Sequence, residues 1–331
     1  MTALALAVAL DLLAGDPPNR WHPVAWIGAL IARGRRHAPR GVDDLALYGT
    51  FLILVVAGVA AAGALAAHAV LATLPAPVAL LGDAWMLKCS LSLDGLFAAV
   101  EITRGHLVAG DLAGARRQVA WHLVSRPTDD LDAPAVASAA VESLAENLTD
   151  GLVSPVCFYV AGALLGGVGA GLALAWAYRA VNTADAMIGY RRDELEYLGR
   201  ATARTDDALN YVPARLAAAT IVAGAWLAGQ SRAGAARVWR RDGSRTESPN
   251  AGQTMAAMAG ALGVTLEKRG HYRLGDGPPP DPDAIDRALR VARGAAALGL
   301  AGAGLTLLVA GLTLRVAGLT LLVAGLTLRV G

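Results

Sequence analysis

Four apolar stretches, each about as long as a helix needs to cross a lipid bilayer, constrain the fold of this chain more than any other feature. A bilayer core of about 30 Å takes about 20 helical residues, and within it only a helix or a closed barrel satisfies every backbone polar group. The stretches contain His68 and Arg215 but no carboxylate. They cover residues 51–74, 152–178, 209–229 and 294–314, and a shorter apolar run covers residues 1–13.

The composition supports a membrane location. Apolar residues make up 55% of the 331 residues and the mean hydropathy is +0.46, whereas soluble domains are usually less apolar. We therefore expect an all-α, polytopic integral membrane protein with amphipathic or re-entrant helices between the spans. Residues 1–331 are expected to form a single membrane-embedded domain. The run 1–13 lacks the basic segment of a signal peptide, so we expect it to stay in the mature protein.

Glycines interrupt the stretch 152–178, and five of them fall within residues 162–171. They either break the helix, so that two half-helices enter and leave the membrane on one face, or let a straight helix pack closely against a neighbour. Polar clusters lie on both sides of the stretch, and a straight crossing would separate them by the bilayer. The segment 230–293 holds eleven Lys and Arg residues, so the positive-inside rule predicts a multi-pass cell-membrane protein whose active site faces the cytoplasm.

A stripe of three carboxylates precedes these glycines. Glu142, Glu146 and Asp150 are spaced i, i+4, i+8, so a helix places them on one face. No Lys, Arg or His occurs from residue 127 to residue 178. Three like charges at a membrane edge require positive charge from elsewhere, which is either a bound metal ion such as Mg²⁺ or a basic segment distant in sequence.

Two further clusters follow the stripe. Arg179, Asn182 and Asp185 combine a guanidinium, an amide and a carboxylate, which suits a phosphate and metal site. Taken alone, they are explained more simply as a helix end at the membrane surface. The second cluster consists of Asp206, Asp207, Asn210 and Arg215. Asn210 shares a helical face with each aspartate, and Arg215 interrupts an apolar stretch, which favours a functional role over a structural one.

A polar turn and a histidine complete the candidates. Ser248 and Asn250 lie in a Ser-Pro-Asn-Ala-Gly turn whose backbone N–H groups could bind an anion, or which simply joins a loop to a helix. His22 lies in a polar turn between apolar runs and is a possible catalytic group.

Several classes of site are excluded or receive no support. Cys89 and Cys157 are too few for a disulfide framework or a thiolate metal site. Neither lysine follows the glycine pattern of a phosphate-binding P-loop. A net charge of +2 points to no nucleic-acid partner. The repetitive apolar tail 303–330, a 14-residue unit repeated once, lengthens the last helix and is assigned no role.

Five motifs together resemble the cobalamin biosynthesis protein CobD/CbiB family, the adenosylcobinamide-phosphate synthases. They occur in the family's order, and the resemblance extends from about residue 10 to about residue 272. The motifs are Asp11–Pro17 with Trp21–Val24, Glu142–Gly151, Tyr178–Tyr190, Asp206–Arg215 and Ser248–Gly252.

The resemblance implies an integral membrane amide ligase that joins (R)-1-amino-2-propanol, or its O-phosphate, to a propionate of adenosylcobyric acid. It further implies ATP and Mg²⁺ as substrate and ion, no tightly bound cofactor, and contact with other enzymes of the corrinoid pathway. We expect the stripe and Asp185 to hold Mg²⁺ or activate the amine. Arg179, Arg215 and the turn 248–252 are expected to contact phosphate.

The chain departs from the family pattern at Pro127, where an Asp is expected, at Gln253, where a Trp is expected, and at Glu267-Lys268, where a Gly pair is common. Two other functions share this architecture. One is a membrane sensor of the AmpE type without ligase activity, and the other is a transporter of corrinoid precursors, although we find no internal repeat outside the tail.

Overall fold

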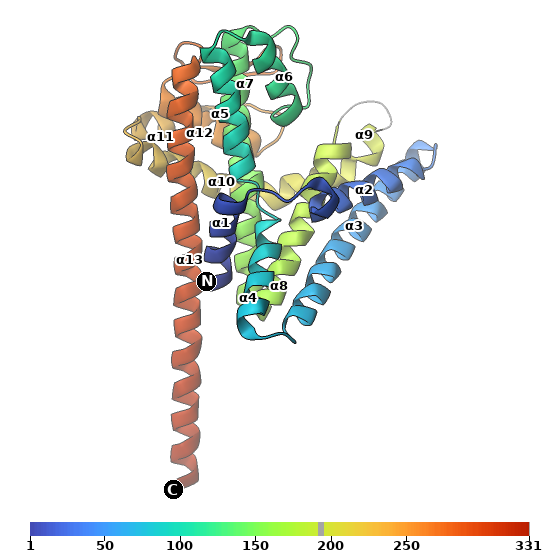
Figure 1. The fold of residues 1–331 in the computed structure, drawn as a ribbon, viewed down its shortest axis with the longest axis vertical. Helices are drawn as coiled ribbons and strands as arrows, with labels where there is room; N and C mark the ends of the chain where they lie inside the picture. The colour runs from blue at the N-terminus through green and yellow to red at the C-terminus, as the bar shows by residue number, and fades with distance from the viewer. Residues whose placement is uncertain (191–194, 331) are drawn as a thin grey trace.

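Helices form almost the whole of the structure, a computed structural model that describes residues 1–190 and 195–330, apart from the side chains of residues 43 and 314–330 (Figure 1). The longer helices are α1 (Thr2–Ala14), α2 (Pro23–Arg36), α3 (Val42–Leu71), α4 (Ala76–Lys88), α5 (Asp94–Val108), α6 (Leu112–His122), α7 (Ala133–Leu148), α8 (Ser154–Ile188), α10 (Arg200–Leu227), α11 (Arg232–Asp242), α12 (Ala251–Leu262) and α13 (Pro282–Val330). Shorter elements are the 3₁₀-helix η1 (Asn19–Trp21), the π-helix η2 (Thr149–Val153), α9 (Leu195–Leu198) and the strands β1 (Leu266–Lys268) and β2 (Tyr272–Leu274).

Three helical segments of the described chain are long and apolar enough to cross a membrane: Asp44–Leu71, Ala133–Ile188 and Pro282–Thr313. They cover most or all of three of the four predicted stretches, and the prediction of an all-α membrane protein is confirmed. The fourth stretch, residues 209–229, lies in α10 and is not among them. In Figure 1, α10 runs across the long axis of the molecule, whereas α13 runs along it. The small side chains of α10 are buried against other helices, because Ala214, Ala217 and Ala218 are fully covered.

The segment Ala133–Ile188 is a helical hairpin and not one straight crossing. Gly166 and Gly167 have non-helical backbone angles, with φ of +77° at Gly167, and the chain reverses there. The two halves of α8 pack so closely that a Cβ atom at Gly162 would lie 2.8 Å from the Gly171 Cα. The outgoing half from Ser154 to the turn is only about 18 Å long at 1.5 Å per residue, shorter than a bilayer core. The re-entrant alternative is therefore the one that the structure favours.

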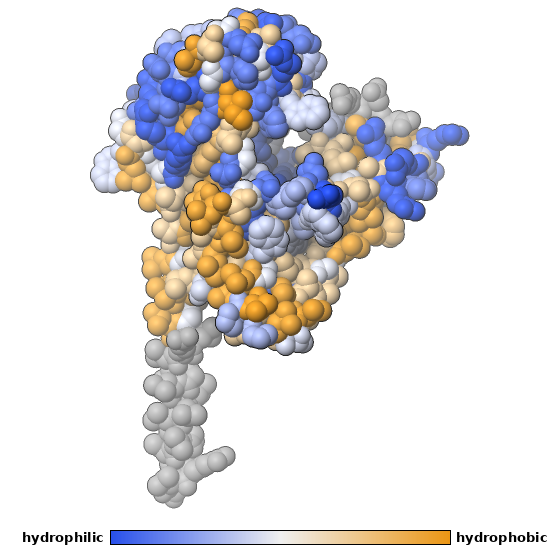
Figure 2. Space-filling model, in the orientation of Figure 1, coloured by the Kyte–Doolittle hydropathy of each residue, from blue (hydrophilic) through white to orange (hydrophobic). Residues whose placement is uncertain are grey.

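Polar and apolar surfaces separate along the long axis (Figure 2). Hydrophilic residues gather over the end formed by α5, α6, α7 and α11, and hydrophobic residues cover α3, α4 and the middle part of α13. The α3–α4 turn and the α8 turn lie at the opposite end of the hydrophobic zone from this polar region. The polar region thus forms a cap on one membrane face, and the hairpins enter the bilayer from it.

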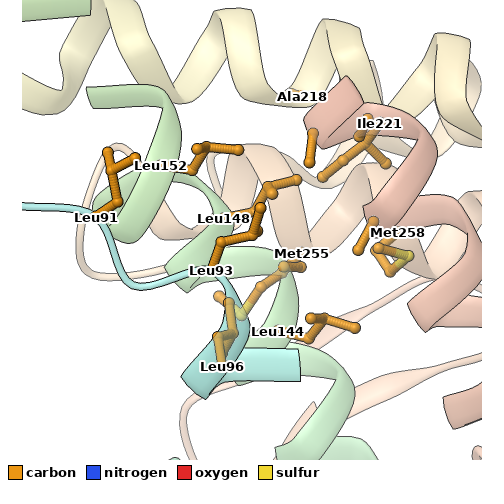
Figure 3. Close-up of a cluster of buried hydrophobic side chains, with 14 of the residues drawn as sticks. Leu91, Leu93, Leu96, Leu144, Leu148, Leu152, Ala218, Ile221, Met255 and Met258 are labelled. Carbon is orange, nitrogen blue, oxygen red and sulfur yellow. The ribbon is translucent and has the colours of Figure 1, made fainter. Parts of the chain in front are cut away.

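A hydrophobic core joins the cap to the hairpin (Figure 3). Leu144, Leu148 and Leu152 pack from α7 and η2 against residues of α10, α12 and the α4–α5 connection. These leucines are at most 2% exposed, so they fix the rotation of the helix that carries the carboxylate stripe on another face. The partners drawn with them are Leu91, Leu93, Leu96, Ala218, Ile221, Met255 and Met258.

The strands β1 and β2 form a short antiparallel hairpin above α7, in which Leu266 pairs with Leu274 and Lys268 with Tyr272. Gly270 takes the left-handed conformation in the turn, with φ of +77°. Hydrogen bonds tie this hairpin to α7: Ser138 Oγ accepts from the Glu267 N–H at 3.0 Å, and Tyr272 Oη donates to Glu142 Oε2 at 2.8 Å. The hairpin therefore holds a fixed position over the first turns of α7.

Candidate functional site

An acidic cavity of about 290 Å³ lies where the cap meets the membrane hairpin. Four of the five sequence motifs contribute to its wall, although they are far apart in the chain. The polar lining consists of Glu146, Thr149, Asp150, Asp185, Tyr190, Asp206, Asp207, Asn210, Glu247, Ser248, Asn250 and Thr254. The reversal of α8 makes this possible, because it returns residues 178–190 to the face on which residues 142–150 lie.

The carboxylate stripe is divided between this cavity and a second one. Glu146 and Asp150 line the acidic cavity, but Glu142 does not. Glu142 is 5% exposed and accepts hydrogen bonds from Ser138 Oγ at 2.6 Å and from Tyr272 Oη at 2.8 Å. Arg126 lies 3.6 Å from it, just before the basic-free segment that the sequence shows. Arg126 precedes the stripe in the sequence but lies beside Glu142 in the fold, so its charge neutralises the first carboxylate of the stripe.

The π-helix η2 places Asp150 at the end of the stripe. A π-turn widens the helix by one residue and frees backbone carbonyl groups, which is common at functional sites. Arg179 Nη1 lies 3.4 Å from the Asp150 main-chain oxygen and 3.2 Å from Asn182 Oδ1. Arg179 is thus directed at η2 and does not line the acidic cavity.

A hydrogen-bonded chain of amides and carboxylates connects the next two motifs. Asn182 Nδ2 lies 3.4 Å from Asp206 Oδ1, and Asn210 Nδ2 donates to Asp206 Oδ2 at 2.9 Å. Asn210 Oδ1 accepts from Ser154 Oγ at 2.5 Å and from Tyr178 Oη at 3.0 Å. Every polar atom of the buried Asn210 side chain therefore has a partner, and Asp206 is held against the cavity.

The Ser-Pro-Asn turn packs against α10 and not into an anion site. Ser248 Oγ donates to Asp207 Oδ1 at 2.8 Å, and Asn250 Nδ2 donates to the Asp207 carbonyl at 2.7 Å. Arg215 stacks on the Tyr211 ring at 3.5 Å and lies 3.3 Å from Asn250 Oδ1. Its guanidinium contacts the turn and does not line the cavity. Gln253, one of the departures from the family pattern, accepts from Trp239 Nε1 at 2.8 Å and supports the same turn by donating to the Pro249 carbonyl at 3.0 Å.

The electrostatics of the acidic cavity are unbalanced. Six carboxylates line it, from Glu146, Asp150, Asp185, Asp206, Asp207 and Glu247, and none of its described lining residues is basic. Burial raises the pKa of Asp206, and the charge of Asp207 raises it further, against hydrogen bonds from Asn210 and Asn182 that stabilise the carboxylate. A site with this excess of negative charge is suited to a cation, either a metal ion or an ammonium group.

Mg²⁺ fits the donor chemistry of this cavity, because carboxylate and amide oxygens are its usual protein ligands. No group of three His, Cys, Asp or Glu side chains is close enough to hold a metal ion within the part of the chain that the structure describes. The proposed set of Glu142, Glu146 and Asp150 does not meet around one point, because Glu142 faces away. Mg²⁺ commonly takes only one or two carboxylates and completes its shell with water and substrate phosphate. Asp150 and Asp206, which act on each other electrostatically, are the residues that would hold it.

His22 lies in a separate polar cluster that sequence reasoning did not assemble. Its Nδ1 accepts from the Val24 N–H at 3.2 Å and caps α2, while Nε2 lies 3.7 Å from Asp16 Oδ1. The His22 imidazole and the Lys88 ammonium lower the pKa of Asp16 to about 2. Lys88 is fully buried and lies 2.6 Å from Asp16 and 3.6 Å from Asp11. The family motif at residues 11–24 therefore builds this cluster and not the acidic cavity.

The cluster still reaches the acidic cavity through the backbone. Asp11 Oδ2 accepts from the Asp94 N–H at 3.1 Å, and two residues earlier the Ser92 N–H donates to the Gly151 carbonyl at 2.9 Å. Lys88 and Asp11 thus hold the segment 92–94 in place, and this segment contacts η2 next to Asp150.

A second, larger cavity of about 610 Å³ lies between the β1–β2 hairpin and the start of α7. Its basic lining residues are Arg126, Lys268, Arg269, His271 and Arg273, and they outnumber the acidic ones, Asp130, Asp132 and Glu267. We call it the basic cavity. Pro127, Glu267 and Lys268, which depart from the family pattern, all line it. Sequence reasoning missed this cavity because its cations come from two segments that are separated by about half of the chain.

Comparison with known proteins gives a consistent result. The family model described as CobD/Cbib protein matches residues 4–301. The cobalamin biosynthesis protein CobD of Dehalococcoides mccartyi is 38% identical over 295 residues, which is 88% of this chain and 92% of that protein. The CobD of Geobacter metallireducens is 40% identical over 308 residues, covering 88% and 92%. A probable CobD of Methanothermobacter thermautotrophicus is 40% identical over 277 residues, covering 83% and 87%. No solved structure matches the chain.

Proposed function

The chain belongs to the CobD/CbiB family and has a role in cobalamin biosynthesis, and we propose that this role is the ATP-dependent formation of an amide bond. In this reaction (R)-1-amino-2-propanol or its O-phosphate is joined to a propionate of adenosylcobyric acid at the cytoplasmic face of the cell membrane. The observation that carries the proposal is the acidic cavity, in which residues of four family motifs come together.

The reaction has two steps. A carboxylate oxygen of the corrin propionate attacks the γ-phosphorus of ATP, the bond from that phosphorus to the ADP oxygen breaks, and ADP leaves. The amine nitrogen then attacks the acyl carbon, the bond from carbon to the phosphate oxygen breaks, and the nitrogen gives up a proton. Mg²⁺, when bound, would neutralise charge on the transferred phosphoryl group.

The carboxylates of the cavity suit the second step. An aminopropanol arrives as an ammonium ion, and a cavity whose described lining residues include six carboxylates and no basic residue attracts it. The nitrogen must lose protons before and during attack, and Glu146 or Asp185, which both face the cavity, would accept them. Asn182 and Asn210 hold Asp206 in place by hydrogen bonds and so keep the wall of the cavity rigid.

The test is a reaction with purified protein in lipid nanodiscs. Adenosylcobyric acid, ATP and Mg²⁺ are supplied with either free aminopropanol or its O-phosphate, and mass spectrometry follows the corrinoid. We expect a corrinoid product enlarged by the aminopropanol residue, with one ADP formed for each amide. Unchanged adenosylcobyric acid with both amines, from protein that is folded and inserted, would reject the ligase.

A further inference from the structure

The acidic cavity leaves one requirement of the proposed reaction unmet. ATP and aminopropanol phosphate carry phosphate groups, yet none of the described residues that line the acidic cavity is basic, and the Arg215 guanidinium outside it is directed at the Tyr211 ring and Asn250. A phosphate bound only among carboxylates is repelled unless a cation intervenes. Positive charge for it must therefore lie nearby.

The basic cavity supplies that charge on a rigid frame. Its volume of about 610 Å³ lies within the usual range for a small-molecule site, about 300–1,000 Å³. The hydrogen bonds from Glu267 to Ser138 and from Tyr272 to Glu142 fix one wall to the other. Its shape thus depends on the packing of α7 and not on a free loop.

Two of its cations have no carboxylate partner in the part of the chain that the structure describes. Arg269 lies 3.2 Å from Asp132, and His271 lies 3.3 Å from Glu247. Arg126 has only the looser contact of 3.6 Å with Glu142. Among the described residues, no carboxylate oxygen lies within 4.0 Å of the side-chain nitrogens of Lys268 or Arg273. Lys268 is also half-buried, so an anion that entered the cavity would restore the interactions that its ammonium group lost on leaving water.

The two cavities lie along one side of α7. Ser138 lines the basic cavity, Glu146 lines the acidic cavity, and Glu142 lies between them at the i+4 position. Eight helical residues rise about 12 Å, a distance that one substrate molecule can span. Lys268 is close enough to interact with the charges of both Glu142 and Glu146.

We propose that the basic cavity binds the phosphate group of a phosphorylated substrate through Arg126, Lys268 and Arg273 and directs the rest of that substrate along α7 toward Glu146. The proposal rests on the ligase function given above, since that function brings a phosphorylated substrate to this face. It assigns recognition of phosphate to the cap and the handling of the amine to the acidic cavity. The ligand is either the nucleotide or the aminopropanol phosphate.

The experiment measures binding without turnover, using the full chain in nanodiscs and no corrinoid. ATP, aminopropanol O-phosphate and free aminopropanol are titrated separately into the wild type, Lys268→Gln, Arg273→Gln and Lys268→Arg. Arg232→Gln, which changes an exposed arginine of α11, is the matched control. Thermal melting confirms that each variant is folded.

We expect one phosphorylated ligand to bind the wild type and to bind each Gln variant roughly 10–100-fold more weakly, because a charge-assisted hydrogen bond is lost. Lys268→Arg should restore most of the affinity, and Arg232→Gln should match the wild type. The ligand that responds identifies the phosphorylated substrate, and free aminopropanol should bind all variants alike.

The inference falls if both phosphorylated ligands bind the Gln variants as well as the wild type, or if neither binds the wild type. These results are separate from the fate of the ligase. Amide formation with unaltered phosphate binding would keep the proposed function and reject this site. Phosphate binding that depends on Lys268 and Arg273, in a protein without ligase activity, would keep the site and reject the function.

Discussion

Tyr178 Oη donates a hydrogen bond of 3.0 Å to Asn210 Oδ1, and this contact joins the returning half of the α8 hairpin to the helix α10 that crosses it. Both side chains are at most 2% exposed. Ser154, at the start of the outgoing half, donates to the same oxygen. One amide therefore holds together both halves of the hairpin and the wall of the acidic cavity.

Replacing Asn210 by Leu should be strongly destabilising. The change leaves the Ser154 hydroxyl without its partner and removes one hydrogen bond each from the Tyr178 hydroxyl and Asp206, at a cost of about 1–3 kcal/mol for a group left unsatisfied. Tyr178→Phe removes one bond and leaves Asn210 two other partners, so it should cost only about 1 kcal/mol. Thermal melting in detergent measures both variants. Equal losses would contradict the central place of Asn210.

The acidic cavity makes a prediction about catalysis. Glu146→Gln should reduce the rate of amide formation by about 10²–10⁴-fold while leaving the melting temperature unchanged or higher, since a partly buried charge among like charges is removed. Glu196→Gln on α9, an exposed residue 3.8 Å from Arg200, is the control and should retain full activity. A fully active Glu146→Gln protein would remove the carboxylate face from the mechanism.

The raised pKa of Asp206 predicts how the stability of the folded protein depends on pH. Its pKa in the folded protein is raised by burial from 3.8 to about 6. Between these values the folded protein holds a proton that the unfolded chain has released, so this group makes stability fall as pH rises from about 4 to about 6, and the loss is complete above that. Asp206→Asn should flatten this part of the profile of melting temperature against pH, measured in EDTA.

Bound Mg²⁺ should stabilise the folded protein at neutral pH, where the ionised Asp206 carboxylate destabilises it. At neutral pH the ionised carboxylates repel one another, and a bound cation that prefers the folded state raises the melting temperature by mass action. We expect Mg²⁺ to raise the melting temperature of the wild type by a few degrees and to have less effect on Asp206→Asn. The same response to Mg²⁺ in both proteins would place the ion elsewhere.

Much of this fold follows from the sequence, and the exceptions have identifiable causes. Hydropathy predicts three of the membrane segments because burial in lipid depends on composition over about 20 residues. Residues 209–229 lie largely in α10, where small side chains such as Ala217 and Ala218 pack against other helices, and composition does not distinguish such packing from contact with lipid. The glycine cluster predicts a break or a close contact, and the structure contains both, at Gly167 and Gly162.

The sequence predicts which residues form the candidate site better than it predicts how they are arranged. Carboxylate spacing and the family motifs indicate Glu146, Asp150, Asp185 and Asp206, which the fold brings to one cavity. The partner of Glu142 could not be inferred, because Tyr272 is 130 positions away and reaches it through a two-stranded hairpin. Local periodicity carries no information about contacts at that separation.

The hairpin makes a topological prediction. Cysteines introduced singly at positions 126 and 200, in a chain with Cys89 and Cys157 replaced by alanine, should both react with a membrane-impermeant maleimide from the same side. The reason is that the chain between them enters the bilayer and returns. Labelling of positions 126 and 200 from opposite sides would contradict the re-entrant hairpin.

The two lysines of the chain should differ sharply in their contribution to stability. Lys88 is fully buried between Asp11 and Asp16, whereas Lys268 is half-buried and has no ion pair with any residue that the structure describes. Lys88→Met should cost about 3–5 kcal/mol, because it leaves the buried Asp11 charge uncompensated. Lys268 acts on the buried Glu142 from beyond ion-pair distance, so Lys268→Met should cost much less stability than Lys88→Met.

The origin of the Lys88 effect can be tested with a second substitution. Asp11→Asn removes the stranded charge, so the double variant Lys88→Met/Asp11→Asn should regain a large part of the stability that Lys88→Met loses, as measured by thermal melting. Asp16 is 38% exposed and can be hydrated, so Asp16→Asn in the same background should recover less. If neither second change restores stability, Lys88 acts through its packing and not through its charge.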